Sequence, residues 1–303
     1  MAKFSRRQFM QFAGVTLLAG HLPAAELLAR PATSVPELTA QHGRVLLPAA
    51  VHAQPRADAE VVSRLWPDSL ISIVDARGSW YRAGGGFVPR SAVQPVLLSQ
   101  PARDLSQPTC PFWAEVSGPV AAVRHWCAAD APLVTRIGHG GTGKIVAALS
   151  PGEPNAPFWY ALAGENHELL GWTQAAHWQP APSLEQGAAL SLEIARSSRQ
   201  LTVFVESRPA LRAAIAAGAE LKPGTYPLRR TRVAGPPLAL VEYGQTLHGA
   251  PWQLSLDDQY SLTGAYWHNR FGDYAPGPAI QVPPFLARWL YAHAGADSMV
   301  YIR

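Results

Sequence analysis

The chain has 303 residues, enough for about two or three domains; 48% of them are hydrophobic and only 15% are charged. This composition supplies ample apolar surface for packed cores and excludes a largely disordered chain. The formal net charge is +4 without a long basic run, so the charge pattern does not indicate nucleic acid as a partner.

The N-terminal segment has the pattern of an export signal. Residues 5–9 (SRRQF) carry paired arginines, followed by a short apolar run over residues 12–20 and by small residues that offer a cleavage region. The apolar run is shorter than the about 20 residues that a membrane-spanning helix requires. We therefore interpret residues 1–32 as a twin-arginine signal peptide, which predicts a periplasmic or cell-envelope protein without a transmembrane span.

The middle of the chain contains an internal repeat. Three segments match in the same order: 58–65 (DAEVVSRL) with 130–137 (DAPLVTRI), 79–82 (SWYR) with 158–161 (FWYA), and 86–95 with 171–180. Turn residues separate short strand-like runs, which in the first copy are expected at 44–47, 61–65, 70–74, 80–81 and 86–88. Each copy therefore predicts a small β-barrel. The pattern resembles the bacterial SH3-like domain, with domain 1 expected over residues 40–97 and domain 2 over residues 112–181.

No pattern in the sequence indicates a cofactor. Residues 138–144 (GHGGTGK) begin like a phosphate-binding loop, but Ile145 stands where such a loop needs Ser or Thr. We interpret this segment as a glycine-rich turn between strands. The ten histidines are scattered, and two cysteines cannot form a Cys-rich zinc site, so we expect no metal. Cys110 and Cys127 could pair after export, or stay as two buried thiols, and the sequence leaves both alternatives open.

The last part of the chain stays β-rich and ends in one helix. Residues 191–196 and 199–204 have the pattern of a hairpin, and residues 283–295 begin with prolines and end with glycine, as a helix does. The stretches 266–272 (YWHNRFG) and 287–291 (ARWLY) are the most distinctive. Together these features resemble the L,D-transpeptidase catalytic domain, over residues 188–303. The expected fold is thus mostly β: two SH3-like barrels, then an L,D-transpeptidase-like β-rich domain with a C-terminal helix.

The resemblance also implies where catalytic groups would stand, and this chain lacks them. Active members read His-Gly-Thr-Tyr-Trp-His-Asn, a spacer, and Ser-His-Gly-Cys; the cysteine takes the acyl group of a stem peptide and passes it to an amine. This chain has Thr263 in place of the upstream histidine, Gly277 in place of the base and Ala279 in place of the cysteine. Acyl transfer of this kind needs a nucleophile with a base beside it. We therefore expect no catalytic residue and an enzyme fold without the family's turnover.

These observations favour a degenerate L,D-transpeptidase-like protein, a non-catalytic pseudoenzyme that binds or scaffolds peptidoglycan. The residues expected to form a ligand-binding cleft are Tyr266, Trp267, His268 and Gln281. The expected partners are peptidoglycan or its stem peptides, or another cell-wall enzyme that the protein supports structurally. The alternative is an active L,D-transpeptidase-type acyltransferase in peptidoglycan cross-linking with a substituted site.

Overall fold

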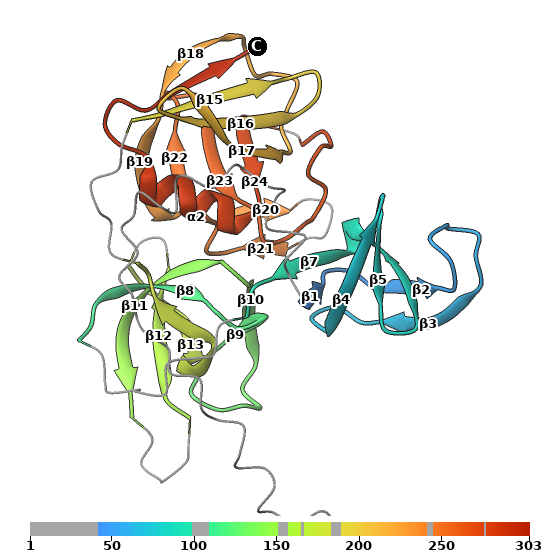
Figure 1. The fold of residues 1–303 in the computed structure, drawn as a ribbon. Coiled ribbons are helices and arrows are strands. Elements are labelled where there is room, and N and C mark those ends of the chain that lie inside the picture. The colour runs from blue at the N-terminus through green and yellow to red at the C-terminus, as the bar shows by residue number, and fades with distance from the viewer. Residues whose placement is uncertain are drawn as a thin grey trace, which may run out of the picture.

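The structure is a computed structural model that describes residues 42–98, 109–150, 157–164, 167–182, 189–240, 245–275 and 277–303. The expected signal peptide lies outside these ranges, as does Pro276. Within them the chain is mostly β, with several sheets and one C-terminal α-helix, which confirms the expected fold class (Figure 1). A search of the described residues finds no helix long and apolar enough to cross a membrane.

The first unit is one sheet of seven short strands. They are β1 (His42–Val45), β2 (Ala49–His52), β3 (Val61–Leu65), β4 (Leu70–Arg77), β5 (Trp80–Ala83), β6 (Gly86–Pro89) and β7 (Val93–Val96), with the 3-10 turn η3 (Arg90–Ala92) before β7. Their order in the sheet is β3-β2-β6-β5-β4-β1-β7. Tyr81, Val88 and Val93 form most of its small core.

The second unit repeats this order strand by strand. Its strands are β8 (Phe112–Val116), β9 (Val120–Arg124), β10 (Leu133–Gly138), β11 (Thr142–Leu149), β12 (Trp159–Ala163), β13 (Leu169–Gln174) and β14 (Trp178–Pro180), with η4 (Ala175–His177) before β14. The order β10-β9-β13-β12-β11-β8-β14 matches that of the first unit position by position. The internal repeat therefore corresponds to one shared topology.

Packing explains why the two copies share a glycine at one matched position. A Cβ atom on Gly86 would lie 2.4 Å from the carbonyl oxygen of His52, and one on Gly171 would lie 2.6 Å from that of Arg124. These contacts join β6 to β2 and β13 to β9, which are equivalent neighbours in the two sheets. A side chain at either position would push these strands apart, because a Cβ atom cannot approach a carbonyl oxygen so closely.

The C-terminal unit combines three sheets with one helix. A five-stranded sheet has the order β17-β16-β15-β25-β18, a four-stranded sheet the order β19-β22-β23-β24, and β20 pairs with β21. The bounds are β15 (Leu190–Ala195), β16 (Gln200–Val205), β17 (Arg208–Ala214), β18 (Gly224–Pro227), β19 (Arg229–Ala234), β20 (Leu238–Leu240), β21 (Gln245–Leu247), β22 (Pro251–Ser255), β23 (Ser261–Gly264), β24 (Ala279–Val282), α2 (Pro284–His293) and β25 (Met299–Ile302). The expected hairpin and terminal helix are both present, as β15–β16 and α2.

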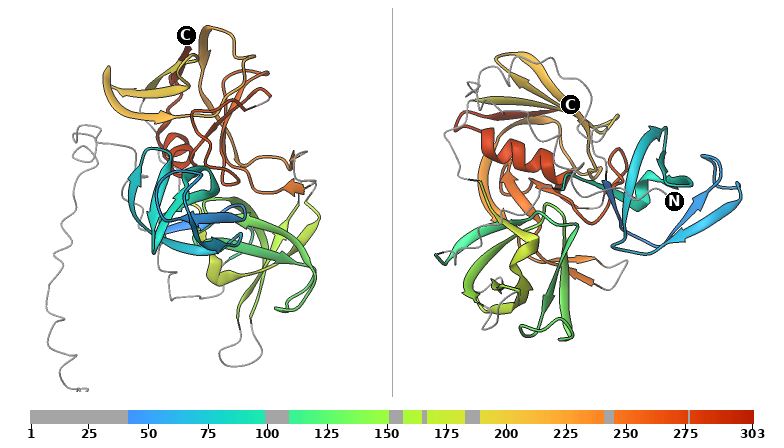
Figure 2. Two further views of the ribbon diagram at one scale, coloured as in Figure 1. Left: turned by 90° about the vertical axis from the view of Figure 1, so that its right-hand side faces the viewer. Right: turned by 60° about the horizontal axis from the view of Figure 1, so that its bottom comes forward.

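The three units lie against one another. Figure 1 shows the second unit below the C-terminal unit and the first unit to the side, and the two further views in Figure 2 agree with this arrangement. Helix α2 packs on β22 and β23 at the edge nearest the second unit, where Arg288 pairs with Glu115 at 3.2 Å. Ligand sites can therefore form at the interfaces between the units.

Candidate functional site

A cavity of about 730 Å³ lies between the first unit and the C-terminal unit. The first unit contributes residues 46–50 together with Pro89, Ser91 and Ala92, and the C-terminal unit contributes β22 to β24 and the segment after β23. Most of the lining is apolar or small. The polar or ionisable side chains in it are Ser91, Gln253, Ser261, Thr263, His268, Arg270, Tyr274 and Gln281. An apolar cavity of this size with a few polar groups suits a small organic or peptide ligand.

The pairing of β23 with β24 brings two of the predicted catalytic positions to one wall. These strands are parallel, with Ser261 opposite Ala279 and Thr263 opposite Gln281. Since side chains alternate along a strand, these four residues share one face, and all four line the cavity. The opposite face carries Leu262, Ile280 and Val282, which are fully buried in the core that also contains α2. One face of this sheet therefore supports the fold and the other faces the cavity.

The groups at the three degenerate positions offer no nucleophile with a base. The Thr263 hydroxyl is buried and donates a hydrogen bond to the carbonyl oxygen of Pro251 at 3.1 Å. Ala279 carries only a methyl group. Gly277 has a backbone φ of +92°, a conformation that residues with a Cβ atom adopt with strain. A histidine at position 277 would therefore strain the backbone as it stands here.

His268 also lines the cavity, but both of its ring nitrogens are engaged. Nδ1 accepts a hydrogen bond from the backbone N–H of Arg270 at 3.1 Å, so Nε2 carries the proton and donates to Oε1 of Gln281 at 2.5 Å. Burial lowers the pKa of His268, and this keeps the ring neutral at pH 7. Because its lone pair is already used, His268 is not a free general base; it orients Gln281 on the cavity wall.

Tyr266 does not lie in the cavity, although the sequence predicted it there. Its side chain is 2% exposed and packs among core residues of the second unit, including Ile137. The Tyr266 hydroxyl donates to the carbonyl oxygen of His248 at 2.6 Å, and burial raises its pKa well above the usual value. Trp267 lines the cavity and Tyr266 does not, although the two residues are adjacent in the chain.

Asn269 is a structural residue that the sequence did not single out. Its Nδ2 donates to the carbonyl oxygens of Val93 at 2.8 Å and Arg90 at 3.0 Å, and lies 3.4 Å from the hydroxyl of Tyr81. All three partners belong to the first unit. The segment that follows β23 is thus fixed to the unit that forms the other wall of the cavity.

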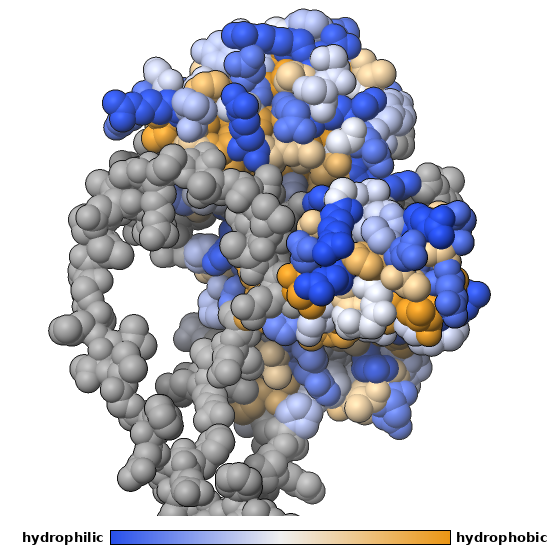
Figure 3. Space-filling model, turned by 45° about the vertical axis from the view of Figure 1, so that its right-hand side comes forward, coloured by the Kyte–Doolittle hydropathy of each residue, from blue (hydrophilic) through white to orange (hydrophobic). Residues whose placement is uncertain are grey.

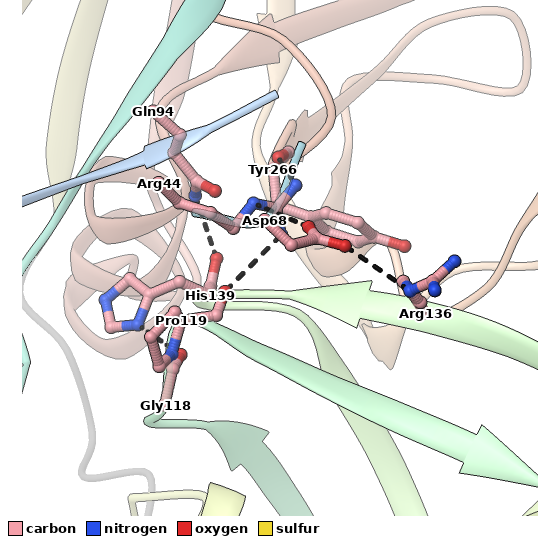
Figure 4. A network of polar contacts seen from close by, with 8 residues as sticks. All are labelled: Arg44, Asp68, Gln94, Gly118, Pro119, Arg136, His139 and Tyr266. Carbon is pink, nitrogen blue, oxygen red and sulfur yellow. Dashed lines mark hydrogen bonds and ion pairs between the residues drawn. The ribbon is translucent and has the colours of Figure 1, made fainter. Parts of the chain in front are cut away.

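A second connection, centred on Arg44, joins all three units (Figure 4). The Arg44 guanidinium is buried and donates to the carbonyl oxygens of Tyr266 at 3.3 Å and Pro119 at 3.4 Å. It also lies 3.7 Å from Asp68, which pairs with Arg136 of the second unit at 3.3 Å. The relative position of the cavity walls therefore depends on a few polar side chains as well as on apolar packing.

The segment at residues 138–144 contains the turn between β10 and β11, which covers residues 139–141. A Cβ atom on Gly138 would overlap the Arg44 guanidinium and the ring of Tyr266, so this glycine makes room for the three-unit connection.

Cys110 and Cys127 are both free thiols. Among the described residues, no group of three or more His, Cys, Asp or Glu side chains could hold a metal ion.

Neither family models nor curated proteins match this chain. Similar solved structures include the catalytic domain of an Enterococcus faecium L,D-transpeptidase, at 13% identity and a TM-score of 0.32 over 37% of this chain and 95% of that one. An L,D-transpeptidase from Stackebrandtia nassauensis matches at 11% and 0.30 over 40% and 58%, and one from Mycobacterium tuberculosis at 10% and 0.33 over 48% and 90%.

Proposed function

We propose that this protein is a non-catalytic, peptidoglycan-binding or scaffolding protein of the cell envelope, built on an L,D-transpeptidase-like domain. The proposal includes a twin-arginine signal over residues 1–32, SH3-like domains over residues 40–97 and 112–181, and the transpeptidase-like domain over residues 188–303. The observation that carries it is a cavity of about 730 Å³ whose wall presents Thr263 and Ala279 on one face, and neither side chain is a nucleophile with a base beside it.

Chemistry supports binding without turnover. Removing the nucleophile from an acyl-transfer site costs about 10⁶ in rate, and groups that act as a unit are not replaced one at a time. Here Ala279 has no lone pair, and the only histidine lining the described cavity, His268, has both ring nitrogens hydrogen-bonded. Pro278 also lacks the backbone N–H that an oxyanion-stabilising loop would use. The remaining apolar lining with a few polar groups is suited to hold a peptide.

Co-sedimentation of the full chain with intact peptidoglycan tests the binding. The variant Ala279→Phe fills the cavity and is expected to reduce the bound fraction about tenfold, and free stem peptide should compete with the unchanged protein. The control is Ala147→Phe, which adds the same bulk on an exposed position of β11. Equal binding by the unchanged protein and both variants would show that the cavity is not the binding site.

Assaying cross-linked stem peptides separates this proposal from the active-enzyme alternative. The unmodified protein is expected to give no cross-link above a no-protein blank. Cross-linking free of contaminating enzyme would support an acyltransferase with a substituted site.

The export proposal has its own test: Arg6→Lys with Arg7→Lys should hold the precursor in the cytoplasm, and normal export of this double variant would contradict it.

A further inference from the structure

A second cavity, of about 400 Å³, lies between the second unit and the C-terminal unit. In Figure 1 it corresponds to the junction where β11 lies below β19. Trp113, Ile137, Leu162, Leu170 and Tyr291 give it an apolar surface. It is distinct from the first cavity, and the two share only the short segment Gly235–Pro236 of their described linings.

The charged side chains that line this cavity have one sign. Lys144 and Arg232 line it together with His167 and His248, and none of the lining residues that the structure describes is acidic. Glu168 is close enough to oppose the lowering of the His248 pKa by burial, but it is not part of the lining. The cavity therefore combines a positive edge with an apolar interior.

The two permanent cations are available to a ligand. Lys144 and Arg232 make no ion pair or hydrogen bond through their side chains with any residue in the described part of the chain. This distinguishes them from Arg288, which pairs with Glu115 across the interface between the C-terminal unit and the second unit. A cation without a protein partner at the edge of an apolar cavity can form a charge-assisted hydrogen bond with an anion.

Hydrogen bonds between the two walls of the cavity fix their relative position. The Thr142 hydroxyl on β11 donates to the carbonyl oxygen of Val233 on β19 at 2.7 Å. The backbone N–H of Thr142 donates to the carbonyl oxygen of Gly249 at 3.0 Å. All three residues belong to the lining. These bonds join the second unit to the C-terminal unit beside Lys144, so a ligand would find both walls already in place.

We propose that this cavity is an anion site for a carboxylate attached to an apolar body, such as an acyl or aryl carboxylate. Lys144 and Arg232 would hold the carboxylate, and the apolar surface around Trp113 and Tyr291 would hold the rest of the ligand. This site is separate from the cavity at Thr263 and Ala279, so its test is independent of the proposed peptidoglycan binding.

The probes that test the site are benzoate, its neutral counterpart benzamide, and inorganic phosphate, titrated into the full chain and followed by NMR. Benzoate is expected to bind about tenfold more tightly than benzamide, because only benzoate carries the charge. The double variant Lys144→Gln with Arg232→Gln should lose about tenfold in benzoate affinity. The matched control, Lys222→Gln with Arg229→Gln, removes the same charge from exposed positions outside the cavity and should bind benzoate like the unchanged protein.

Each result decides the proposal. Equal affinities for benzoate and benzamide, equal losses in the test and control variants, or no binding of benzoate would overturn it. Binding of phosphate in place of benzoate, with loss in the Lys144 and Arg232 variant alone, would overturn the apolar half of the proposal and assign a phosphate-bearing ligand. If the double variant does not fold, the comparison of benzoate with benzamide on the unchanged protein still tests the charge requirement.

Discussion

The first and second units share one strand order but attach to the C-terminal unit in different ways. The core of the second unit continues into the C-terminal unit, since Tyr266 and Leu247 are buried among its side chains. The first unit has a smaller core of its own, and polar contacts join it to its neighbours: its Arg44 donates to Tyr266, and its Val93 carbonyl oxygen accepts from Asn269 of the C-terminal unit. The same strand order therefore has two uses. The second unit shares a core with the C-terminal unit, and the first unit forms one wall of a cavity and is attached through polar contacts.

A matched pair of residues shows how this difference arises. Leu65 and Ile137 end the same repeated motif, yet Ile137 is fully buried beside Tyr266 and Leu65 is only partly buried. Next to Leu65, Trp66 is 70% exposed. On the first unit, Figure 3 shows polar and apolar residues interspersed over the face that it presents. Repeated sequence thus fixes the strands, while the neighbour that covers them decides which side chains become core.

The largest expected effect comes from breaking the shared core. Tyr266→Ala removes a buried aromatic ring and should lower the free energy of unfolding by about 3–5 kcal/mol. Because the ring belongs to the core of the second unit but is carried by the C-terminal unit, hydrogen exchange should accelerate in both units together.

Tyr81→Ala provides the matched control for that substitution. Tyr81 is equally buried, but its ring packs in the core of the first unit, and its hydroxyl lies 3.4 Å from Asn269 of the C-terminal unit. Its loss should accelerate hydrogen exchange in the first unit and leave β10 to β12 protected. Loss of protection in the second unit on Tyr81→Ala would show that the two repeats do not differ as inferred here.

A smaller effect is expected from the polar connection between the three units. Arg44→Met keeps the length of the side chain but removes its hydrogen bonds to Tyr266 and Pro119 and its ion pair with Asp68. Asp68 keeps Arg136 as a partner, so the cost should be about 1–3 kcal/mol in chemical denaturation. Arg77→Met removes an exposed ion pair instead and should change stability by less than about 1 kcal/mol. Equal effects of the two substitutions would rule out a special role for Arg44.

The pH dependence of stability sharpens the same comparison. His139 lies at the three-unit connection, and burial, with a contribution from Arg44, lowers its pKa below the usual value near 6.5. The unfolded chain therefore binds a proton that the folded chain resists, and stability should fall as the pH drops below about 6.5 toward the folded pKa. His139→Gln should reduce this slope, by at most about 1.4 kcal/mol per pH unit.

Denaturation midpoints between pH 5 and pH 7 measure that slope. His293→Gln, at the exposed end of α2, is the control for replacing a histidine. An identical pH dependence in the His139 variant and the unchanged protein would exclude His139 as the group responsible.

The sequence predicts the fold better than it predicts the contacts between units. Strand alternation, turn residues and the repeat are local patterns, and they correctly indicate β units with a common order and a terminal helix. In the structure Trp267, His268 and Gln281 line one cavity, since Trp267 and His268 follow β23 and Gln281 lies on the adjacent β24. Arg44 and Asn269 carry no local signal, since a buried polar residue in a strand or loop is recognised only by the partner that it meets across the chain.

The misplacement of Tyr266 has the same origin. In the sequence it is the first of two adjacent aromatic residues, and the resemblance predicts both in one cleft. Tyr266 is buried in the core of the second unit beside Ile137, whereas Trp267 packs only partly against that core and also lines the cavity that the first unit helps to form. Which side each ring takes depends on units that are distant in the sequence.

The last prediction tests whether the first unit covers the cavity, and it uses a reporter thiol at position 279. Ala279→Cys is placed in a chain with Cys110→Ser and Cys127→Ser, so that one thiol remains. Asn269→Ala then removes the hydrogen bonds to Arg90 and Val93 that attach the cavity segment to the first unit. These bonds are worth about 1–3 kcal/mol together, so alkylation by a bulky maleimide should become roughly tenfold faster.

The same thiol also separates access from chemistry. Intact-mass spectrometry should detect alkylation of the reporter chain but no carbapenem adduct, with or without Asn269→Ala, because the thiol has no base beside it: His268 is engaged and position 277 is glycine. Adding Gly277→His alone should not restore the adduct, since a backbone φ of +92° holds a histidine there only with strain. A carbapenem adduct on the Ala279→Cys chain would show that a base remains within reach, and an unchanged maleimide rate after Asn269→Ala would show that the first unit does not restrict entry to the cavity.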